Sequence, residues 1–283
     1  MMQHLKHHDV ERLCAGRVCD LSATCHGAGG GVHYLERCMD RVELHFHLLP
    51  GVDDGPGDLG TALDLAREAV ADGTGLVVCT PHAHMIDVAE LPDRVRRLRA
   101  ALAAAGVDLE IRAGAELSWD HVARYDDEML EAVAQGPPGR RWILLEAPLP
   151  GTGELDDFEG AARELRERGY GLLVGHPERS TAMMADPEAV DRLIEAGDRV
   201  QVNASSLVGY HGSAARAAGI EIVRSGRADV LASDAHQPFV RGATLSRAID
   251  VLHEHGFDAR RLASSEPRAL LERGIASARR LAA

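Results

Sequence analysis

From about residue 42 onward, short apolar runs alternate with amphipathic stretches, a pattern that predicts strands followed by helices. The runs are continuous and rich in Val, Leu and Ile, as buried strands of a parallel sheet are. Seven strands are expected, at 42–44, 76–80, 109–115, 142–145, 172–175, 200–202 and 230–233. Regular alternation of strand and helix implies parallel strands joined by right-handed crossovers.

Apolar residues at helical spacing fill the stretches between these strands. Asp58 suits the N-cap of a helix over 59–70, and Pro92 suits the first turn of a helix that ends at Gly106. Two further helices are expected to end at Gly169 and Gly197, and another covers 245–252. No internal repeat or linker interrupts the pattern, so residues 41–283 are expected to form a single domain.

Most of the predicted strands are followed by a side chain of a metal-binding type. These residues are His45, His47, His82, Glu116, Glu146, His176, Asp234 and His236. The carboxyl ends of parallel strands meet at one edge of a sheet, so the side chains should converge there. Because metal-binding side chains follow most of the seven strands, a closed α/β barrel is favoured over an open sheet.

Asp54 brings the candidate metal ligands to nine, which is more than one ion can use. Three ions that share bridging carboxylates would use them all. Imidazole and carboxylate without thiolate suit Mn, Fe or Zn and disfavour a structural cysteine-type zinc site. Each residue alone has an ordinary alternative, because a lone histidine is usually structural and Asp53-Asp54 could form a turn. The prediction therefore depends on their joint placement.

Four other histidines lie in expected loops or on helix faces and are interpreted as solvated. They are His121, His211, His253 and His255.

The chain has 283 residues, 45% of them hydrophobic, and a formal net charge of −13. An acidic chain without a basic run argues against nucleic acid as a partner. No stretch has the length and apolarity of a membrane span or signal peptide, so a cytoplasmic protein is expected.

Residues 1 to about 40 show no clear hydrophobic period. Four cysteines lie in this segment, Cys14, Cys19, Cys25 and Cys38, with several histidines nearby. A zinc module is one interpretation, but no Cys-x-x-Cys pair supports it. We interpret residues 1–40 as an N-terminal extension that is either disordered or the result of a mis-assigned start upstream of Met39. The fifth cysteine, Cys79, is expected in the core.

Six motifs follow one another in an order that is typical of a known superfamily. They are Glu-Leu-His-Phe-His-Leu-Leu-Pro-Gly-Val-Asp-Asp-Gly-Pro at 43–56, Thr-Pro-His at 80–82, Gly-Ala-Glu at 114–116, Gly-His-Pro-Glu-Arg at 175–179, Gln-Val-Asn-Ala-Ser-Ser at 201–206 and Ala-Ser-Asp-Ala-His at 232–236. Together they resemble the PHP (polymerase and histidinol phosphatase) superfamily. The first motif and the Gln201 segment most resemble the capsule-type (CpsB/CapC) bacterial protein-tyrosine phosphatases. The likeness runs from about residue 40 to about residue 260.

The resemblance implies a distorted seven-stranded α/β barrel of the PHP type with three divalent ions, usually manganese. It implies one ion held by His45, His47, Glu116 and Asp234, a second by Glu116, Glu146 and His176, and a third by Asp54, His82 and His236. Glu43 departs from the pattern, because the family commonly has Asp before the first histidine. The longer carboxylate should alter hydrogen bonding around the ligands rather than abolish metal binding.

Arg179 lies three residues after His176, and Arg241 lies five after His236. A guanidinium can donate to two phosphate oxygens at once, and the resemblance implies that both arginines hold the phosphoryl group. The expected function is therefore a metal-dependent phosphomonoester hydrolase, a protein-tyrosine phosphatase in which a metal-activated hydroxide attacks phosphorus. Asp234 belongs to the expected catalytic core. A phosphotyrosine protein, such as a bacterial tyrosine autokinase, is the expected partner, with a link to capsular or exopolysaccharide regulation.

Histidinol-phosphate phosphatase, or another small-molecule PHP phosphoesterase, is the alternative function, because its catalytic residues would be nearly identical. A non-enzymatic binding module is disfavoured by the intact ligand set, and a nuclease by the acidic charge. A cysteine-nucleophile phosphatase needs Arg six residues after Cys. The residues at that offset are Asp20, Cys25, Gly31, Leu44 and Met85, which excludes this mechanism.

Overall fold

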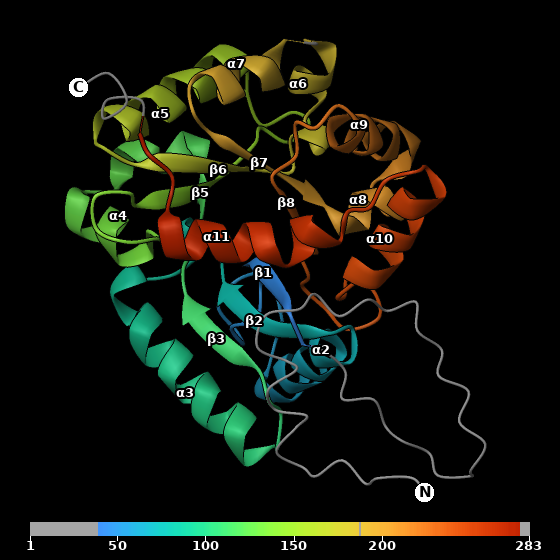
Figure 1. Ribbon diagram of the computed structural model, residues 1–283. Coiled ribbons are helices and arrows are strands. Elements are labelled where there is room, and N and C mark those ends of the chain that lie inside the picture. The colour runs from blue at the N-terminus through green and yellow to red at the C-terminus, as the bar shows by residue number, and fades with distance from the viewer. Residues whose placement is uncertain (1–38, 187, 278–283) are drawn as a thin grey trace, which may run out of the picture. The chain divides into compact units, whose positions relative to one another are not determined.

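The computed structural model describes residues 39–277 except residue 187. The prediction for residues 1–40, with its four cysteines, falls almost entirely outside the described residues and stays a prediction. The family of parallel strands that the sequence predicts is present, in two sheets (Figure 1). The first sheet has the order β1-β2-β3, with β1 at Arg41–Phe46, β2 at Thr74–Cys79 and β3 at Glu110–Ala113.

The second sheet has the order β4-β5-β6-β7-β8. Its strands are β4 Glu116–Ser118, β5 Trp142–Glu146, β6 Gly171–Gly175, β7 Arg199–Asn203 and β8 Val230–Ala232. All neighbouring strands in both sheets pair in parallel. The α/β class with parallel strands is therefore confirmed.

The expected closed barrel of seven strands has to be corrected, because the described residues form eight strands in two sheets. The predicted strand at 109–115 is interrupted, and β3 and β4 lie on either side of Gly114. A Cβ at Gly114 would lie 2.7 Å from Val78 Cγ1, so the chain changes sheets at a place where only glycine fits without a shift. Isolated parallel bridges, His82 with Glu116 and Phe46 with Ala235, pair residues across the two seams between the sheets.

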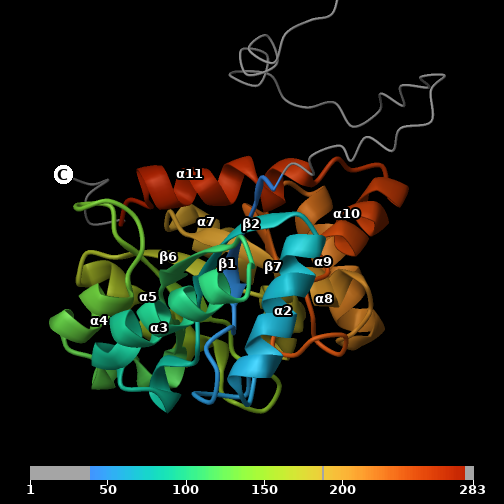
Figure 2. The ribbon, with the colours of Figure 1, turned by 90° about the horizontal axis from the view of Figure 1, so that it is seen from below.

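Helices pack around the sheets in both views (Figures 1 and 2). They are α2 Leu59–Ala71, α3 Leu91–Ala104, α4 Asp127–Val133, α5 Leu155–Glu167, α6 Thr181–Ala185, α7 Ala189–Glu195, α8 Ala204–Leu207, α9 Gly212–Arg224, α10 Leu245–Glu254 and α11 Ser265–Arg273. The five helices expected from the sequence are confirmed as α2, α3, α5, α7 and α10, and Asp58 caps α2 through Thr61 N–H. None of the helices in the described part of the chain is long and apolar enough to span a membrane.

Helix α11 lies across one end of the sheets (Figure 2), where the indole of Trp142 donates to the Leu270 carbonyl at 3.0 Å. Trp142 is the first residue of β5, so α11 covers the amino ends of the strands. The opposite, carboxyl ends are left to the loops that carry the candidate ligands.

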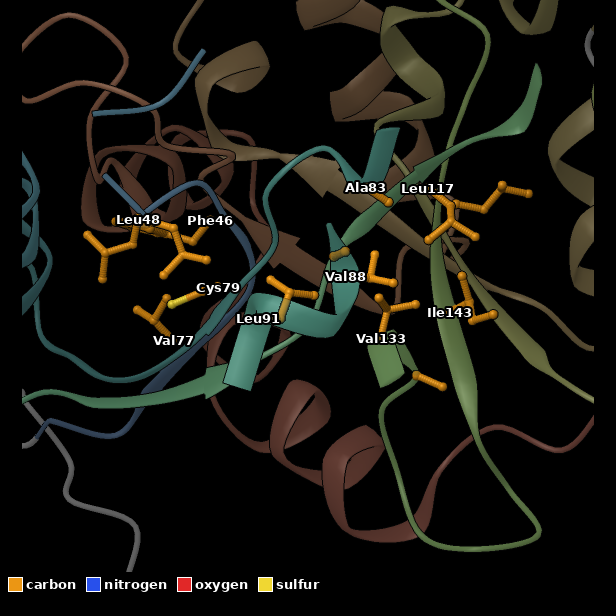
Figure 3. Packing of buried hydrophobic residues seen from close by; sticks show 14 of the residues in the cluster. Phe46, Leu48, Val77, Cys79, Ala83, Val88, Leu91, Leu117, Val133 and Ile143 are labelled. Atoms are coloured by element: carbon orange, nitrogen blue, oxygen red, sulfur yellow. The ribbon is translucent and has the colours of Figure 1, made fainter. Parts of the chain in front are cut away.

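Most strands have side chains buried on both faces, which explains their continuous apolar runs, whereas Glu110 and Arg112 of β3 are exposed. In β2, Val77 and Cys79 pack with Leu91 and other helix-side residues (Figure 3), whereas Leu76 and Val78 pack on the other face of the sheet. The expectation of Cys79 as a core residue is confirmed, and burial raises the pKa of its thiol to about 12.

Candidate metal centre

The structure brings all nine predicted ligands together. Eight of them lie at the carboxyl ends of strands or in the loops that follow, and Glu116 is the first residue of β4, three positions after the end of β3. Four groups of donor atoms lie within 4.8 Å of one another: His47, Asp54, His82 and His236; His45, His47 and Glu116; His45, His176 and Asp234; and His82, Glu116 and Glu146. The shared members join these groups into one cluster. Its donors come from both sheets, because β1 carries His45 and precedes His47 and Asp54, β2 precedes His82, and β4, β5, β6 and β8 carry or precede the other five.

Glu116 lies at the centre of the cluster. Its Oε1 is 3.2 Å from both His45 Nε2 and His176 Nε2, and its Oε2 is 3.1 Å from His82 Nδ1. Burial alone would raise the pKa of Glu116, but His45 and the other surrounding histidines hold it well below its usual range. A buried, ionised carboxylate with imidazoles at both oxygens has the arrangement of a bridging ligand.

The two oxygens of Asp234 face different partners. Oδ1 lies 3.3 Å from His45 Nε2, on the histidine side of the site. Oδ2 accepts hydrogen bonds from Asn203 Nδ2 at 2.7 Å, Arg179 Nη1 at 2.9 Å and Arg241 Nη2 at 2.8 Å. The two arginines that the sequence predicts for phosphate binding thus meet at one oxygen of a candidate ligand.

Backbone strain is present at two of these strand ends. Asp234 and His176 have φ angles of 53° and 39°, in the left-handed region that residues other than glycine seldom adopt. Such conformations cost free energy and persist where the surroundings hold them, often at functional sites. Here they turn both side chains toward the cluster immediately after β8 and β6.

Asp54, His82 and His236 form the outer part of the cluster. Asp54 Oδ1 lies 3.1 Å from His236 Nε2 and 3.4 Å from His82 Nε2, and the His236 ring stacks on His47 with centroids 3.8 Å apart. Burial alone would raise the pKa of Asp54, but both histidines lower it below its usual range. This grouping matches the third set that the family resemblance implies, with His47 added.

Glu146 is placed differently from the set that the resemblance implies. It groups with His82 and Glu116, and its Oε1 is 4.0 Å from His176 Nε2. Burial and the nearby charge of Glu116 raise the pKa of Glu146 to about 8. His176 instead groups with His45 and Asp234.

The donor set fits divalent ions. His82 Nδ1 and His236 Nε2 are buried and make no hydrogen bond with the described residues. Yet Glu116 Oε2 lies 3.1 Å from His82 Nδ1, and Asp54 Oδ1 lies 3.1 Å from His236 Nε2. Nitrogen and oxygen atoms that face one another without hydrogen-bond geometry suit a shared cation, and the mixture of imidazole and carboxylate suits Mn, Fe or Zn.

Two residues that orient the histidines were not given a role from the sequence. His47 Nδ1 donates to Asp53 Oδ2 at 2.7 Å, and His45 Nδ1 donates to Gln201 Oε1 at 3.0 Å. Both bonds leave Nε2 facing the cluster, as partners of metal-binding histidines do. The only sequence signals were the position of Asp53 beside Asp54 and of Gln201 near the end of a strand.

Glu43 lies beneath the cluster and makes no hydrogen bond to the candidate ligands in the described structure. Its Oε2 accepts from the backbone N–H of Ser233 at 2.9 Å, and burial raises its pKa to about 8. Glu43 therefore acts on the site through the backbone that leads into Asp234.

The interpretation of His211 as solvated is wrong. The residue is half-buried, and its Nε2 is 3.1 Å from the Ser205 hydroxyl. Burial, with the charges of Arg179 and Arg241, lowers the pKa of His211 to about 3, so its imidazole is neutral beside the arginines. His253 and His255 are exposed, as expected. His121 is partly buried and lies against His84 with ring centroids 4.7 Å apart.

The cluster combines imidazole and carboxylate donors at the carboxyl ends of parallel strands with two partly buried arginines, Arg179 and Arg241. This arrangement defines the class of metal-dependent α/β hydrolases. The model of the family described as "Capsular polysaccharide synthesis, CpsB/CapC" matches residues 41–272, and the chain belongs to this family. The resemblance found in the sequence is thereby confirmed.

Two curated relatives support this assignment. The chain is 25% identical over 217 residues to tyrosine-protein phosphatase YwqE of Bacillus subtilis (strain 168), a match that covers 75% of this chain and 84% of YwqE. It is 28% identical over 204 residues to CapC of Staphylococcus aureus, covering 69% of this chain and 76% of CapC.

Solved structures also support the α/β fold described above. One match comes from work on YwqE of Bacillus subtilis and CpsB of Streptococcus pneumoniae, described as metal-dependent tyrosine phosphatases. It has a TM-score of 0.70 at 25% identity and covers 81% of this chain and 93% of the other. A 5-methylcytosine deaminase from Klebsiella pneumoniae, with a TM-score of 0.51 at 15% identity over 82% of this chain and 74% of the other, shares the fold alone.

Proposed function

We propose that this protein is a metal-dependent protein-tyrosine phosphatase that hydrolyses the phosphomonoester of phosphotyrosine. The observation that carries the proposal is the meeting of Arg179 and Arg241 at Asp234 Oδ2, directly beside the imidazole and carboxylate cluster. YwqE and the CpsB proteins of Streptococcus agalactiae are named tyrosine-protein phosphatases, which supports phosphotyrosine as the substrate.

The proposal includes three divalent ions, with manganese preferred and iron or zinc as alternatives. The sets are His45, His47, Glu116 and Asp234; Glu116, Glu146 and His176; and Asp54, His82 and His236. Ions bound there would supply an activated water and offset the negative charge that develops on the phosphoryl oxygens. The central position of Glu116, with histidines at both of its oxygens, supports a shared ligand between sites.

The arginines position the substrate. Each guanidinium has five N–H donors and uses only one or two of them on carboxylates of the site, so donors remain for phosphate oxygens. Asp234 retains the hydrogen bond from Asn203 while the arginines turn to the substrate. His211 is neutral beside the two arginines, so the positive charge facing the phosphate comes from the arginines and the bound ions.

The remaining parts of the proposal concern the fold and the setting of the enzyme. We propose that the two sheets are the halves of a distorted PHP-type barrel, which the bridges at both seams support. Residues 41–283 form one phosphoesterase domain, and residues 1–40 are an extension outside it. The protein is cytoplasmic and acts on a phosphotyrosine protein such as a bacterial tyrosine autokinase, in keeping with a family described by capsular polysaccharide synthesis.

One experiment tests the activity and the metal requirement together. Purified protein is assayed in parallel on a phosphotyrosine peptide and on histidinol phosphate, and the metal content of the same sample is measured. We expect bound divalent metal, loss of activity on chelation, best recovery with manganese, and a higher kcat/KM for the peptide. A higher kcat/KM for histidinol phosphate, or full activity after chelation, would contradict the proposed function.

A further inference from the structure

The loop that joins His236 to Arg241 presents an apolar tip to solvent. Phe239 is 92% exposed and Val240 is 63% exposed, more than any other large hydrophobic side chain in the described part of the chain. Most large apolar side chains gain stability from burial, and exposed ones near a site often mark an interaction surface. Packing within the domain does not explain this tip.

The loop is held in a defined shape. Gln237 and Arg241 form an antiparallel bridge, and His236 N–H donates to the Arg241 carbonyl at 2.7 Å. From helix α2, Glu68 Oε2 accepts from Phe239 N–H at 3.0 Å. Phe239 has a φ of 63°, which is costly for a bulky residue and is maintained by these contacts. A strained, anchored and exposed phenylalanine is consistent with a role in binding.

The base of this loop belongs to the candidate site. His236 faces Asp54, and Arg241 donates to Asp234 beside Arg179. An extended polypeptide advances about 3.3 Å per residue, so residues one to three positions from a bound phosphotyrosine would reach the loop tip. The tip segment, Gln237 to Val240, carries no charged side chain, so its contact with that polypeptide would be apolar.

We propose that Phe239 and Val240 dock an apolar side chain that flanks the phosphotyrosine in a protein substrate. This inference rests on the proposed function and adds the substrate class: phosphotyrosine within an extended, apolar-flanked segment, in preference to small phosphomonoesters. The loop thus connects phosphate binding at Arg241 with recognition of the neighbouring sequence.

The test compares three substrates in the full chain: a phosphotyrosine peptide with apolar flanking residues, the same peptide with serine at those positions, and p-nitrophenyl phosphate. Phe239→Asn removes the ring while tolerating a left-handed backbone, and Phe239→Leu keeps an apolar side chain as the matched control. We expect Phe239→Asn to lower kcat/KM for the apolar peptide by about tenfold, as for a central contact of an interface. The two other substrates should change less than about twofold, and Phe239→Leu should retain most of the activity on the apolar peptide.

Three outcomes would overturn the docking proposal. An equal loss on all three substrates would mean that the loop only positions Arg241. No loss on any substrate would remove Phe239 from recognition. A change in oligomeric state of Phe239→Asn by light scattering, with unchanged kinetics, would assign the tip to contact with a second copy. A wild-type protein inactive on both peptides would instead overturn the proposed function and the docking proposal with it.

Discussion

At the scale of single residues, Asp234 connects metal binding with phosphate binding. One oxygen faces His45, and the other accepts from Asn203 and both arginines. Asp234→Ala should leave the protein folded but reduce its metal content and lower kcat/KM by at least about a thousandfold, because a shared charged group is lost from the site. Metal analysis and steady-state kinetics on one preparation check this. Near wild-type kinetics in the variant would contradict the proposed ligand set.

The arginines separate substrate binding from metal binding. Arg179→Ala or Arg241→Ala should lower kcat/KM by about 30- to 150-fold, since each removes a charge-assisted contact worth about 2–3 kcal/mol. Metal content should be unchanged, because Asp234 keeps Asn203 and the other arginine. Arg→Lys should recover only part of the loss, and the double variant should fall short of additivity. Metal loss in either single variant would show that the arginine mainly supports Asp234.

Metal binding should depend on pH through the histidines. Burial alone would lower the pKa of His45, but Glu116 and Asp234 raise it to about 9. Burial alone would likewise lower the pKa of His82, but the contacts of this ring with Asp54 and Glu116 raise its pKa to about 11. Both rings are thus protonated in the metal-free site at neutral pH, and each must lose its proton to bind a cation.

Mn²⁺ added to chelated enzyme should therefore release protons, and its affinity should fall as the pH is lowered. Calorimetric titration in buffers of different ionisation enthalpy measures the release. A pH-independent affinity without proton release would contradict the assigned ligands.

At the scale of elements, the gap between β3 and β4 depends on Gly114. Gly114→Ala would place a Cβ 2.7 Å from Val78 Cγ1, so it should lower the free energy of unfolding by about 1–3 kcal/mol. Gly160 within α5 is the matched control, because nothing lies within 4 Å of its added Cβ. Gly160→Ala should be neutral or raise stability by up to about 1 kcal/mol. Urea unfolding measures the free energy of unfolding of both variants. Equal changes in that free energy would contradict a packing role for Gly114.

The same elements show what the sequence could and could not predict. Apolar runs located the strands that are buried on both faces, because such burial leaves an unbroken hydrophobic signal. Strands β3 and β4 were expected as a single strand at 109–115. The interruption at Gly114 was not predictable, since it depends on contact with a side chain of another strand. Helix α9, Gly212–Arg224, was not predicted from the sequence, although its amphipathic pattern is similar to those of α2 and α3. Likewise Gln201 reaches His45 across 156 positions of sequence, a pairing that only the fold creates.

At the scale of the whole molecule, the domain should function without residues 1–38. The family match begins at residue 41, and β1 begins at Arg41. Deleting residues 1–38 should leave metal content, kcat/KM and the unfolding midpoint essentially unchanged. Side-by-side measurement on the full chain and the truncated chain provides the check. Aggregation or metal loss in the shorter chain would show that the segment takes part in the domain.

The division of the strands into two sheets has a consequence for how the protein acquires its activity. His45, His47 and His82 lie on or after strands of the three-stranded sheet, whereas Glu116 and Asp234 lie on or after strands of the five-stranded one. The proposed sets of the first and third ions combine donors from both sheets, so high-affinity capture of these two cations must wait until both halves have associated. Ions that bind only the finished molecule would increase its stability by mass action. Cellular metal supply would thereby set the enzyme's lifetime as well as its turnover.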